Sequence, residues 1–311
     1  MSHPILLSSI VKKETLKGSL LVLAGASGYG LLSPIAKLAY KDGFSAAAVS
    51  VSQVLTGVLM VGVILIIQYF TGTKSTSYIK PSTRQKFLLA GAGTFLGLTT
   101  VLIYKALELL PASIGIVLLF QFTWMGIVME VILTKKRPDI AKLFSLLILL
   151  SGTLFASGAI EASSAHLSTV GIVWALLSAV SYTLVIYVSG NTVTEAAPFT
   201  RTFYMSLGSL AITLLCFPPE TIVFSLTNTE MIKWGLLLGF LGAVLVPVLL
   251  NTGLPAVSLA LGTILSAAEL PVVVIASVLI LGEYVSALQW LGVGGILFAI
   301  ALPYFWNNKQ K

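Results

Sequence analysis

The stretch from Val257 to Leu281, VSLALGTILSAAELPVVVIASVLIL, contains 25 residues and one charged side chain, that of Glu269. About 20 consecutive apolar residues suffice to cross the hydrocarbon core of a bilayer as an α-helix. A membrane-spanning β-strand would instead show roughly ten residues of alternating polar and apolar character. The stretch therefore predicts a transmembrane helix with one acidic residue near its middle.

Composition extends this prediction to the whole chain. Of its 311 residues, 57% are apolar and only 9% are charged, whereas about a quarter are charged in a typical soluble domain. Lipid favours an apolar surface and requires backbone groups to be satisfied within the protein. We expect an all-α membrane protein with ten transmembrane helices, near residues 18–38, 46–70, 86–106, 110–133, 140–159, 169–189, 199–217, 233–253, 257–281 and 286–306. The eighth and ninth are separated by a short link in which Pro255, lacking a backbone donor, predicts a break.

The basic residues predict an orientation, because short cytoplasmic segments of membrane proteins are enriched in Lys and Arg. With the N-terminus in the cytoplasm, fourteen of the 18 basic residues, Arg201 among them, fall on the cytoplasmic side. We therefore expect a multi-pass protein of the plasma membrane, from a bacterial source, with both termini cytoplasmic. The net charge of +7 is then a topology signal, and no nucleic-acid partner is expected because no basic patch includes aromatic residues.

The chain contains an internal repeat. Residues 86–150 align without a gap on residues 233–297 at an offset of 147, and the first and sixth spans align at an offset of 153, which places Tyr29 on Tyr182. Five spans per repeat is an odd number, so the second repeat enters the membrane from the opposite side. We expect two inverted five-helix repeats, at residues 15–160 and 168–308, an arrangement that recurs in secondary transporters.

Two segments carry a family resemblance. Residues 104–125 contain YKALELLPAS and LLFQFTWM, and residues 266–283 contain SAAELP and LILGE. They resemble the fourth and ninth helices of EamA-type members of the drug/metabolite transporter superfamily, although the fourth span here ends in TKKRP and not in Gly-Glu. The resemblance implies two EamA repeats, transport of small metabolites such as amino acids by export or uptake, and a central cavity. It implies that the first, third, fourth, sixth, eighth and ninth helices line that cavity.

Glu269 is the first candidate for a functional residue, because ionisable groups deep in a bilayer are costly and normally face a cavity. Pro271 removes a backbone donor two residues later and is expected to bend the helix. A carboxylate here can exchange a proton in each transport cycle or pair with a cationic group of the substrate. The equally supported alternative is a structural hydrogen bond from a protonated Glu269 to a neighbouring helix.

Gln121 and Trp124 are three residues apart and share a helix face. An amide beside an indole suits the polar and flat parts of a substrate. Alternatively, Gln121 bonds across helices and Trp124 lies at a membrane interface.

The remaining candidates occupy the repeats and the ninth-span motif. Tyr29 and Tyr182 are equivalent in the two repeats, as are Tyr104 and Asn251, and Ser266 begins the ninth-span motif. Each is a candidate for contact with substrate or for coupling, and each could equally make an interhelical hydrogen bond.

Other residues of the spans have structural interpretations. We expect Glu130 to form a structural ion pair with Lys135 or Lys136. Gly93 and Gly97 in the third span, like Gly28 and Gly30 in the first, are expected to let helices approach closely.

Enzymatic classes find little support in the sequence. The only histidines are His3 and His166, and no phosphate-binding loop of the GxxxxGK[ST] type occurs. We therefore expect neither cofactor nor metal, and a secondary carrier that moves a small molecule across the lipid bilayer by alternating access, driven by a proton or substrate gradient. The alternative is a membrane-embedded enzyme or channel, and the oligomeric state is left open.

Overall fold

The computed structural model describes residues 3–72, 78–107, 109–110, 112–160 and 168–309, and its regular elements in these residues are helices. The all-α prediction is therefore confirmed. The α-helices are α1 (His3–Lys41), α2 (Ala46–Phe70), α3 (Thr83–Leu107), α4 (Ala112–Leu119), α5 (Phe122–Thr134), α6 (Ile140–Ala156), α7 (Thr169–Asn191), α8 (Pro198–Cys216), α9 (Pro219–Thr227), α10 (Thr229–Gly239), α11 (Val246–Gly253), α12 (Leu259–Ser266), α13 (Glu269–Ala276) and α14 (Ala287–Lys309). Two π-helices, η1 (Phe240–Leu245) and η3 (Ser277–Leu281), and one 3₁₀-helix, η2 (Leu254–Ala256), join some of them.

Nine helical segments of the described chain are long and apolar enough to cross a membrane. They correspond to nine of the ten expected spans. The fifth expected span, 140–159, is represented by α6, an apolar helix of 17 residues. The chain is thus a multi-pass membrane protein, and the role of α6 as a tenth span requires a separate argument.

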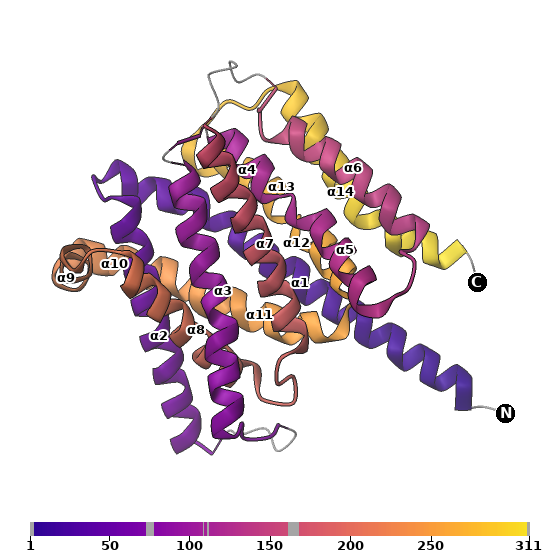
Figure 1. Cartoon of the computed structure of the whole chain (residues 1–311), viewed down its shortest axis with the longest axis horizontal. Helices are drawn as coiled ribbons and strands as arrows, with labels where there is room; N and C mark the ends of the chain where they lie inside the picture. The colour runs from indigo at the N-terminus through magenta and orange to yellow at the C-terminus, as the bar shows by residue number, and fades with distance from the viewer. Residues whose placement is uncertain (1–2, 73–77, 108, 111, 161–167, 310–311) are drawn as a thin grey trace.

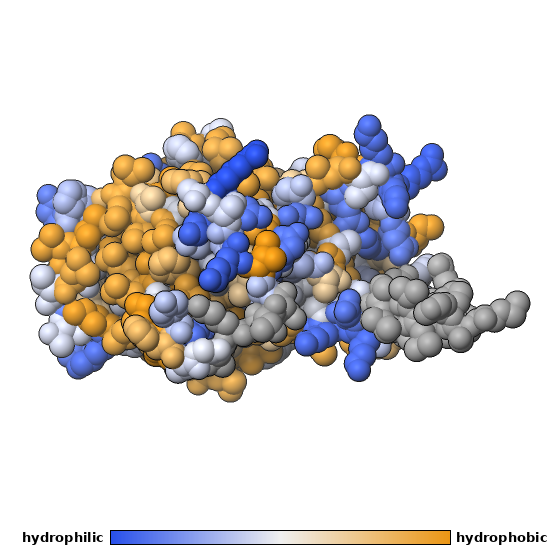
Figure 2. Space-filling model, turned by 90° about the horizontal axis from the view of Figure 1, so that it is seen from below, coloured by the Kyte–Doolittle hydropathy of each residue, from blue (hydrophilic) through white to orange (hydrophobic). Residues whose placement is uncertain are grey.

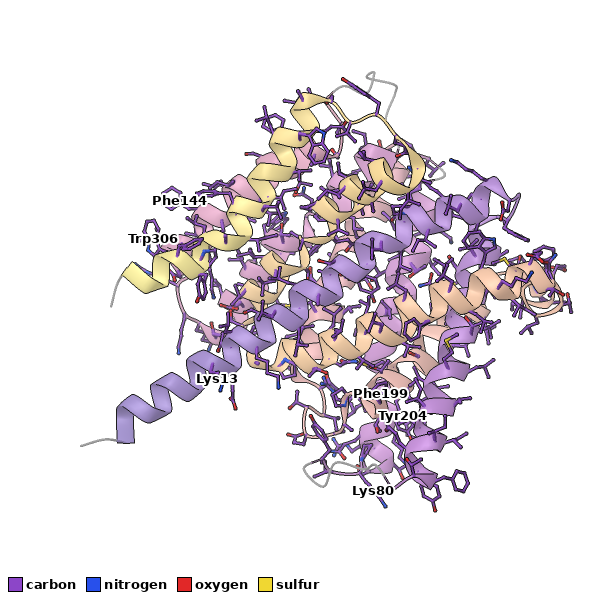
Figure 3. The ribbon with its side chains drawn as sticks, turned by 180° about the vertical axis from the view of Figure 1, so that it is seen from behind. Lys13, Lys80, Phe144, Phe199, Tyr204 and Trp306 are labelled. Atoms are coloured by element: carbon purple, nitrogen blue, oxygen red, sulfur yellow. The ribbon has the colours of Figure 1, made fainter. Side chains whose placement is uncertain are left out.

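Helix α6 packs along α14, and the two lie side by side at the edge of the molecule (Figure 1). Glycines permit this contact, because a Cβ at Gly152 would lie 2.9 Å from the carbonyl oxygen of Gly292. Near the other end of the pair, the rings of Phe144 and Trp306 stack with centroids 6.3 Å apart (Figure 3). The two helices therefore form one packed unit.

The remaining spans pack through small residues. Helix α3 lies against α7 and α8, and α10 and α11 lie against α2 and α1 respectively. A Cβ at Gly93 would overlap the backbone of Met205, and one at Gly97 would lie 2.8 Å from the carbonyl oxygen of Ser209. The packing role predicted for both glycines is confirmed.

The eighth and ninth expected spans are separate helical segments. The 3₁₀-helix η2 contains Pro255, as the sequence predicts, and ends the eighth span. Within that span, α10 is followed by the π-helix η1. Pro247 lies near the start of α11, directly after this π-helix.

The outer surface is apolar over wide areas. Large side chains such as Leu59, Phe87 and Leu215 are mostly exposed. Figure 2 shows apolar side chains over much of one face, with the hydrophilic ones gathered in separate groups. Such a surface suits lipid and would be unfavourable in water.

Candidate functional site

Two spans are broken near their middle. In the ninth, α12 ends at Ser266 and α13 begins at Glu269; in the fourth, α4 ends at Leu119 and α5 begins at Phe122. Pro271 accounts for the break in the ninth span, because it has no N–H to donate to the carbonyl of Ala267. The break places Glu269 in the first turn of α13.

Glu269 lies beside two tyrosines from other spans. Its carboxylate is close enough to Tyr29 of α1 and Tyr182 of α7 to act on both electrostatically. A glycine permits the approach of α1, because a Cβ at Gly30 would lie 2.5 Å from the carbonyl oxygen of Glu269. Three of the candidates, from distant parts of the sequence, therefore lie near one another.

Among the described residues, no side chain forms a hydrogen bond or an ion pair with the carboxylate of Glu269. Glu269 and Tyr29 are partly exposed. An unpaired carboxylate in such surroundings needs a proton or a cation to compensate its charge.

Aromatic rings and one hydroxyl complete the surroundings. The ring of Phe122, the repeat equivalent of Glu269, meets that of Tyr182 edge to face at 4.8 Å, and Phe120 lies 5.4 Å from Phe122. The hydroxyl of Ser266, one turn before Glu269, is fully buried and has no partner in the described part of the chain. This group is called the Glu269 cluster below and comprises Glu269, Tyr29, Tyr182, Phe122 and Ser266.

Gln121 and Trp124 form a local pair. Trp124 Nε1 donates to Gln121 Oε1 at 2.9 Å, and Gln121 Nε2 donates to the carbonyl oxygen of Val117 at 3.0 Å. Both ends of the amide are therefore engaged within the fourth span, and Gln121 forms no cross-helix bond to the residues that the structure describes. Trp124 is half-exposed at this point.

Asn251 lies in a polar network that the sequence did not predict. Its amide donates to Thr202 Oγ1 at 3.0 Å, while its side-chain oxygen is buried without a partner among the described residues. Arg201, which the sequence indicates only as a cytoplasmic charge, is fully buried and donates to the carbonyl oxygens of Asn251, Ser189 and Thr192. The expected partner of Asn251 in the other repeat, Tyr104, has a side chain that lies outside the described residues.

Arg201 therefore caps two helix ends. Ser189 and Thr192 lie at the end of α7 and Asn251 lies in the last turn of α11, where the helix dipoles present partial negative charge. The one sequence signal for this role is the position of Arg201 just inside an apolar span.

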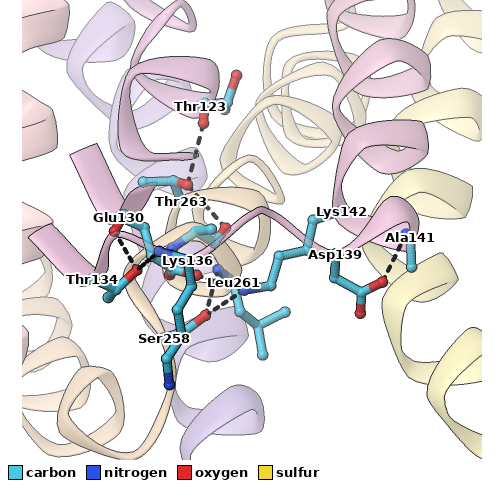
Figure 4. A network of polar contacts seen from close by, with 11 residues as sticks. Thr123, Glu130, Thr134, Lys136, Asp139, Ala141, Lys142, Ser258, Leu261 and Thr263 are labelled. Carbon is cyan, nitrogen blue, oxygen red and sulfur yellow. Dashed lines mark hydrogen bonds and ion pairs between the residues drawn. The ribbon is translucent and has the colours of Figure 1, made fainter. Parts of the chain in front are cut away.

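Glu130 joins helices α5, α6 and α12 in the network of Figure 4. Its Oε1 pairs with Lys142 Nζ at 2.7 Å, and its Oε2 accepts the backbone N–H of Ala260 at 2.6 Å. Lys142 Nζ also donates to Ser258 Oγ at 3.0 Å. The prediction of a structural ion pair is confirmed, but Lys135 or Lys136 as its partner is wrong. Lys135 adopts a left-handed conformation that ends α5, with φ of 55°, and the chain then turns so that Lys142 of α6 reaches Glu130.

Comparison with known proteins finds a family model that matches the second half of the chain. Residues 169–305 match the EamA-like transporter family. No curated protein matches the chain. A solved structure titled "Crystal structure of protein" aligns with 93% of this chain and 97% of its own, with a TM-score of 0.70 and 17% sequence identity, so the fold extends over nearly the whole chain.

The match and the apolar helices together support a membrane transporter of small molecules. The matched segment includes Tyr182, Asn251, Ser266 and Glu269. After the ninth span, Glu283 of its Gly-Glu pair forms an ion pair of 2.9 Å with Lys37 of α1. The closing Gly-Glu thus ties the ninth span to the first.

Proposed function

We propose that this protein is a secondary carrier of small metabolites that works by alternating access, with Glu269 as its coupling carboxylate. The observation that carries the proposal is an unpaired acidic side chain at a break in the ninth span, beside Tyr29 and Tyr182. A charge at this depth costs several kcal/mol, so a structural role alone would favour a neutral residue. Amino acids and related compounds, moved outward, are the first substrates to test.

Helix boundaries support the proposal of two inverted repeats, at residues 15–160 and 168–308. Helices α4 and α12 begin at residues 112 and 259, α5 and α13 at 122 and 269, and α6 and α14 at 140 and 287. Each pair differs by 147, the offset found in the sequence. Lys135 and Gly282, which differ by the same number, both have left-handed backbone at a helix end.

The same correspondence supports α6 as a tenth span. At 1.5 Å per residue its 17 residues extend about 26 Å, close to the ~30 Å hydrocarbon core. Its repeat equivalent, α14, meets the length expected of a span and packs along it.

An asymmetry between the repeats supports alternating access. Helix α5 of the fourth span packs on α12 of the ninth, and the Glu130 network ties their ends together. Exchange of the repeats would pair α4 with α13, yet α4 packs mainly on α7 and α13 mainly on α1. One end of the fourth and ninth spans is therefore more tightly closed than the other. With cytoplasmic termini, the closed end faces the cytoplasm and the carrier is outward-facing.

The proposal is tested with purified protein in liposomes preloaded with members of a metabolite panel. A carrier exchanges labelled for unlabelled substrate at a saturable rate, whereas a channel shows no counterflow. If no compound exchanges and the protein instead modifies one, the carrier is refuted and the enzyme alternative stands.

A further inference from the structure

The lipid-facing surface carries a groove between α2 and α10 that shares no residue with the Glu269 cluster. The groove has a volume of about 470 Å³, within the range of ligand pockets, and residues of α2, α9, α10 and η1 line it. We propose that it binds one acyl chain of a membrane phospholipid. This inference concerns the outer surface of the protein, so its test is independent of the carrier function.

Small residues fix the walls of the groove to each other. Helices α9 and α10 lie at one edge of the molecule and pack on α2 (Figure 1). A Cβ at Gly57 of α2 would lie 2.2 Å from the Cβ of Ala243, and one at Gly235 of α10 would lie 2.0 Å from Ser52 Oγ. Such small residues let helix backbones approach closely. Because these contacts tie the walls together, the groove is part of the packed structure.

Three hydroxyl groups form the polar part of the lining, and their protons are already used. Ser52 Oγ of α2 donates to the carbonyl oxygen of Met231 at 3.2 Å. Thr56 Oγ1 donates to that of Gly235 at 2.6 Å, and Ser225 Oγ donates to a carbonyl oxygen of its own helix, α9, at 2.8 Å. The other described residues of the lining are apolar, and none is charged. A polar ligand would lose its water here without compensation, whereas a hydrocarbon chain has no such loss.

The dimensions of the groove fit a single chain. On α2 the lining extends from Ser52 to Ile64, which is about 18 Å at 1.5 Å per residue and comparable with half of the ~30 Å hydrocarbon core. A volume of about 470 Å³ over this length gives a mean cross-section of about 26 Å². That is the width of one extended hydrocarbon chain. An α-helix with its side chains is about 10–12 Å across and is too wide to enter.

The groove opens towards lipid. Leu59 of α2 and Phe240 of η1 line it and are 63% and 51% exposed. They continue the apolar surface that lipid chains contact, so a chain can enter the groove sideways. Ser225 Oγ also lies 3.2 Å from the carbonyl oxygen of Ala48, near the start of α2, so α9 lies at that end of the groove. With cytoplasmic termini this end is extracellular, and the phospholipid belongs to the outer leaflet.

Phospholipid binding to purified protein in detergent tests the proposal. Protein stripped of lipid is titrated with dipalmitoyl phosphatidylglycerol and observed by native mass spectrometry. Wild-type protein should bind one phospholipid at least roughly tenfold more tightly than any further one, because the groove buries a chain that the open surface leaves exposed. Binding should also raise the Tm, since a ligand of the folded state stabilises that state.

A variant with a filled groove locates the bound chain. Leu59→Trp with Leu236→Trp adds bulk from opposite walls and should weaken binding of the first phospholipid at least roughly tenfold. Leu147→Trp with Leu297→Trp, on α6 and α14, is the matched control, because these leucines are 62% and 49% exposed and lie outside the groove. The control should bind as wild type. Equal binding by the two double variants would overturn the proposal.

Chain length and headgroup separate an acyl-chain site from a headgroup site in wild-type protein. Dihexanoyl phosphatidylglycerol has the same headgroup on short chains and should bind at least roughly tenfold more weakly. Dipalmitoyl phosphatidylcholine, whose headgroup is zwitterionic, should bind as well as its phosphatidylglycerol counterpart, because the described lining is uncharged. Binding that follows the headgroup and not the chain would overturn the proposal. A protein dimer that only the filled-groove variant abolishes would also overturn it, because the occupant would then be a second copy of this chain.

Discussion

At the scale of single residues, Arg201 and Glu269 are ionisable side chains inside the bundle with opposite surroundings. Arg201 is enclosed and its three donor nitrogens are all used by carbonyl oxygens from two helix ends. Glu269 has no partner among the described side chains. A charge that is fully bonded holds the structure together, and one that is unbonded is available to a ligand or a proton.

Removal of Arg201 should destabilise the fold. Arg201→Ala leaves the carbonyl oxygens of Ser189, Thr192 and Asn251 without a donor, at a cost of about 3 kcal/mol. Thermal unfolding in detergent should show a clearly lower Tm for this variant than for Arg84→Ala, whose arginine is exposed at the start of α3. Equal Tm values would contradict the capping role.

At the scale of helical elements, the ends and breaks follow the repeat more closely than the residue types do. The backbone is left-handed at both Lys135 and Gly282, although a lysine gains nothing from that conformation and a glycine adopts it freely. The fourth span lacks the closing Gly-Glu of the ninth span. It nevertheless keeps the same left-handed turn, with a different side chain.

This turn predicts a stabilising substitution. Lys135→Gly should raise the free energy of unfolding by about 0.5–1 kcal/mol, because glycine meets no steric penalty at φ of 55°. Gly282→Val should lower it by a similar or larger amount. Thermal unfolding of the two variants in parallel checks both signs, and a Lys135→Gly variant less stable than wild type would contradict the prediction.

The close contact between α3 and α8 predicts a destabilising substitution. Gly93→Leu would force a side chain into the backbone of Met205 and should cost about 2 kcal/mol or more. Gly91→Leu is the matched control, since a Cβ at Gly91 meets nothing. Purified yield and Tm of the two variants should therefore differ, and equal values would show that α3 and α8 tolerate separation.

Local patterns predict elements, and tertiary contacts do not follow from them. Apolar length located the spans, and Pro255 and Pro271 marked two breaks because proline acts on its own helix. The break before Phe122 has no proline to mark it. The predicted partner of Glu130 was wrong because the actual partner, Lys142, reaches Glu130 only after the chain turns. The burial of Arg201 likewise depends on helices that are far apart in sequence. The repeat made Tyr29 and Tyr182 candidates as a pair, whereas their approach to Glu269 depends on helices far apart in sequence.

At the scale of the whole molecule, the Glu130 network links α5, α6 and α12 at one end of the fourth and ninth spans (Figure 4). In an alternating-access carrier this end must open in each cycle. Loss of the network should therefore favour the open state without removal of the Glu269 cluster.

The accessibility of a cysteine placed at this end of the molecule measures the shift towards the open state. In a Cys216→Ser background, Thr263→Cys places a thiol in the buried contact between α5 and α12. A membrane-impermeant maleimide applied to the cytoplasmic face should label it slowly, and several-fold faster when Glu130→Gln is added. Addition of Glu230→Gln should leave the rate unchanged. Labelling that is equally slow with and without Glu130→Gln would show that the network does not hold this end closed.

The account depends most on Glu269 as the group that couples transport to protons. Substrate accumulation driven by an imposed pH gradient in liposomes measures this coupling directly. We expect Glu269→Gln to reduce gradient-driven accumulation at least roughly tenfold, Glu269→Asp to retain part of it and Glu230→Gln to match wild type. Accumulation by Glu269→Gln equal to that of wild type would contradict the central claim.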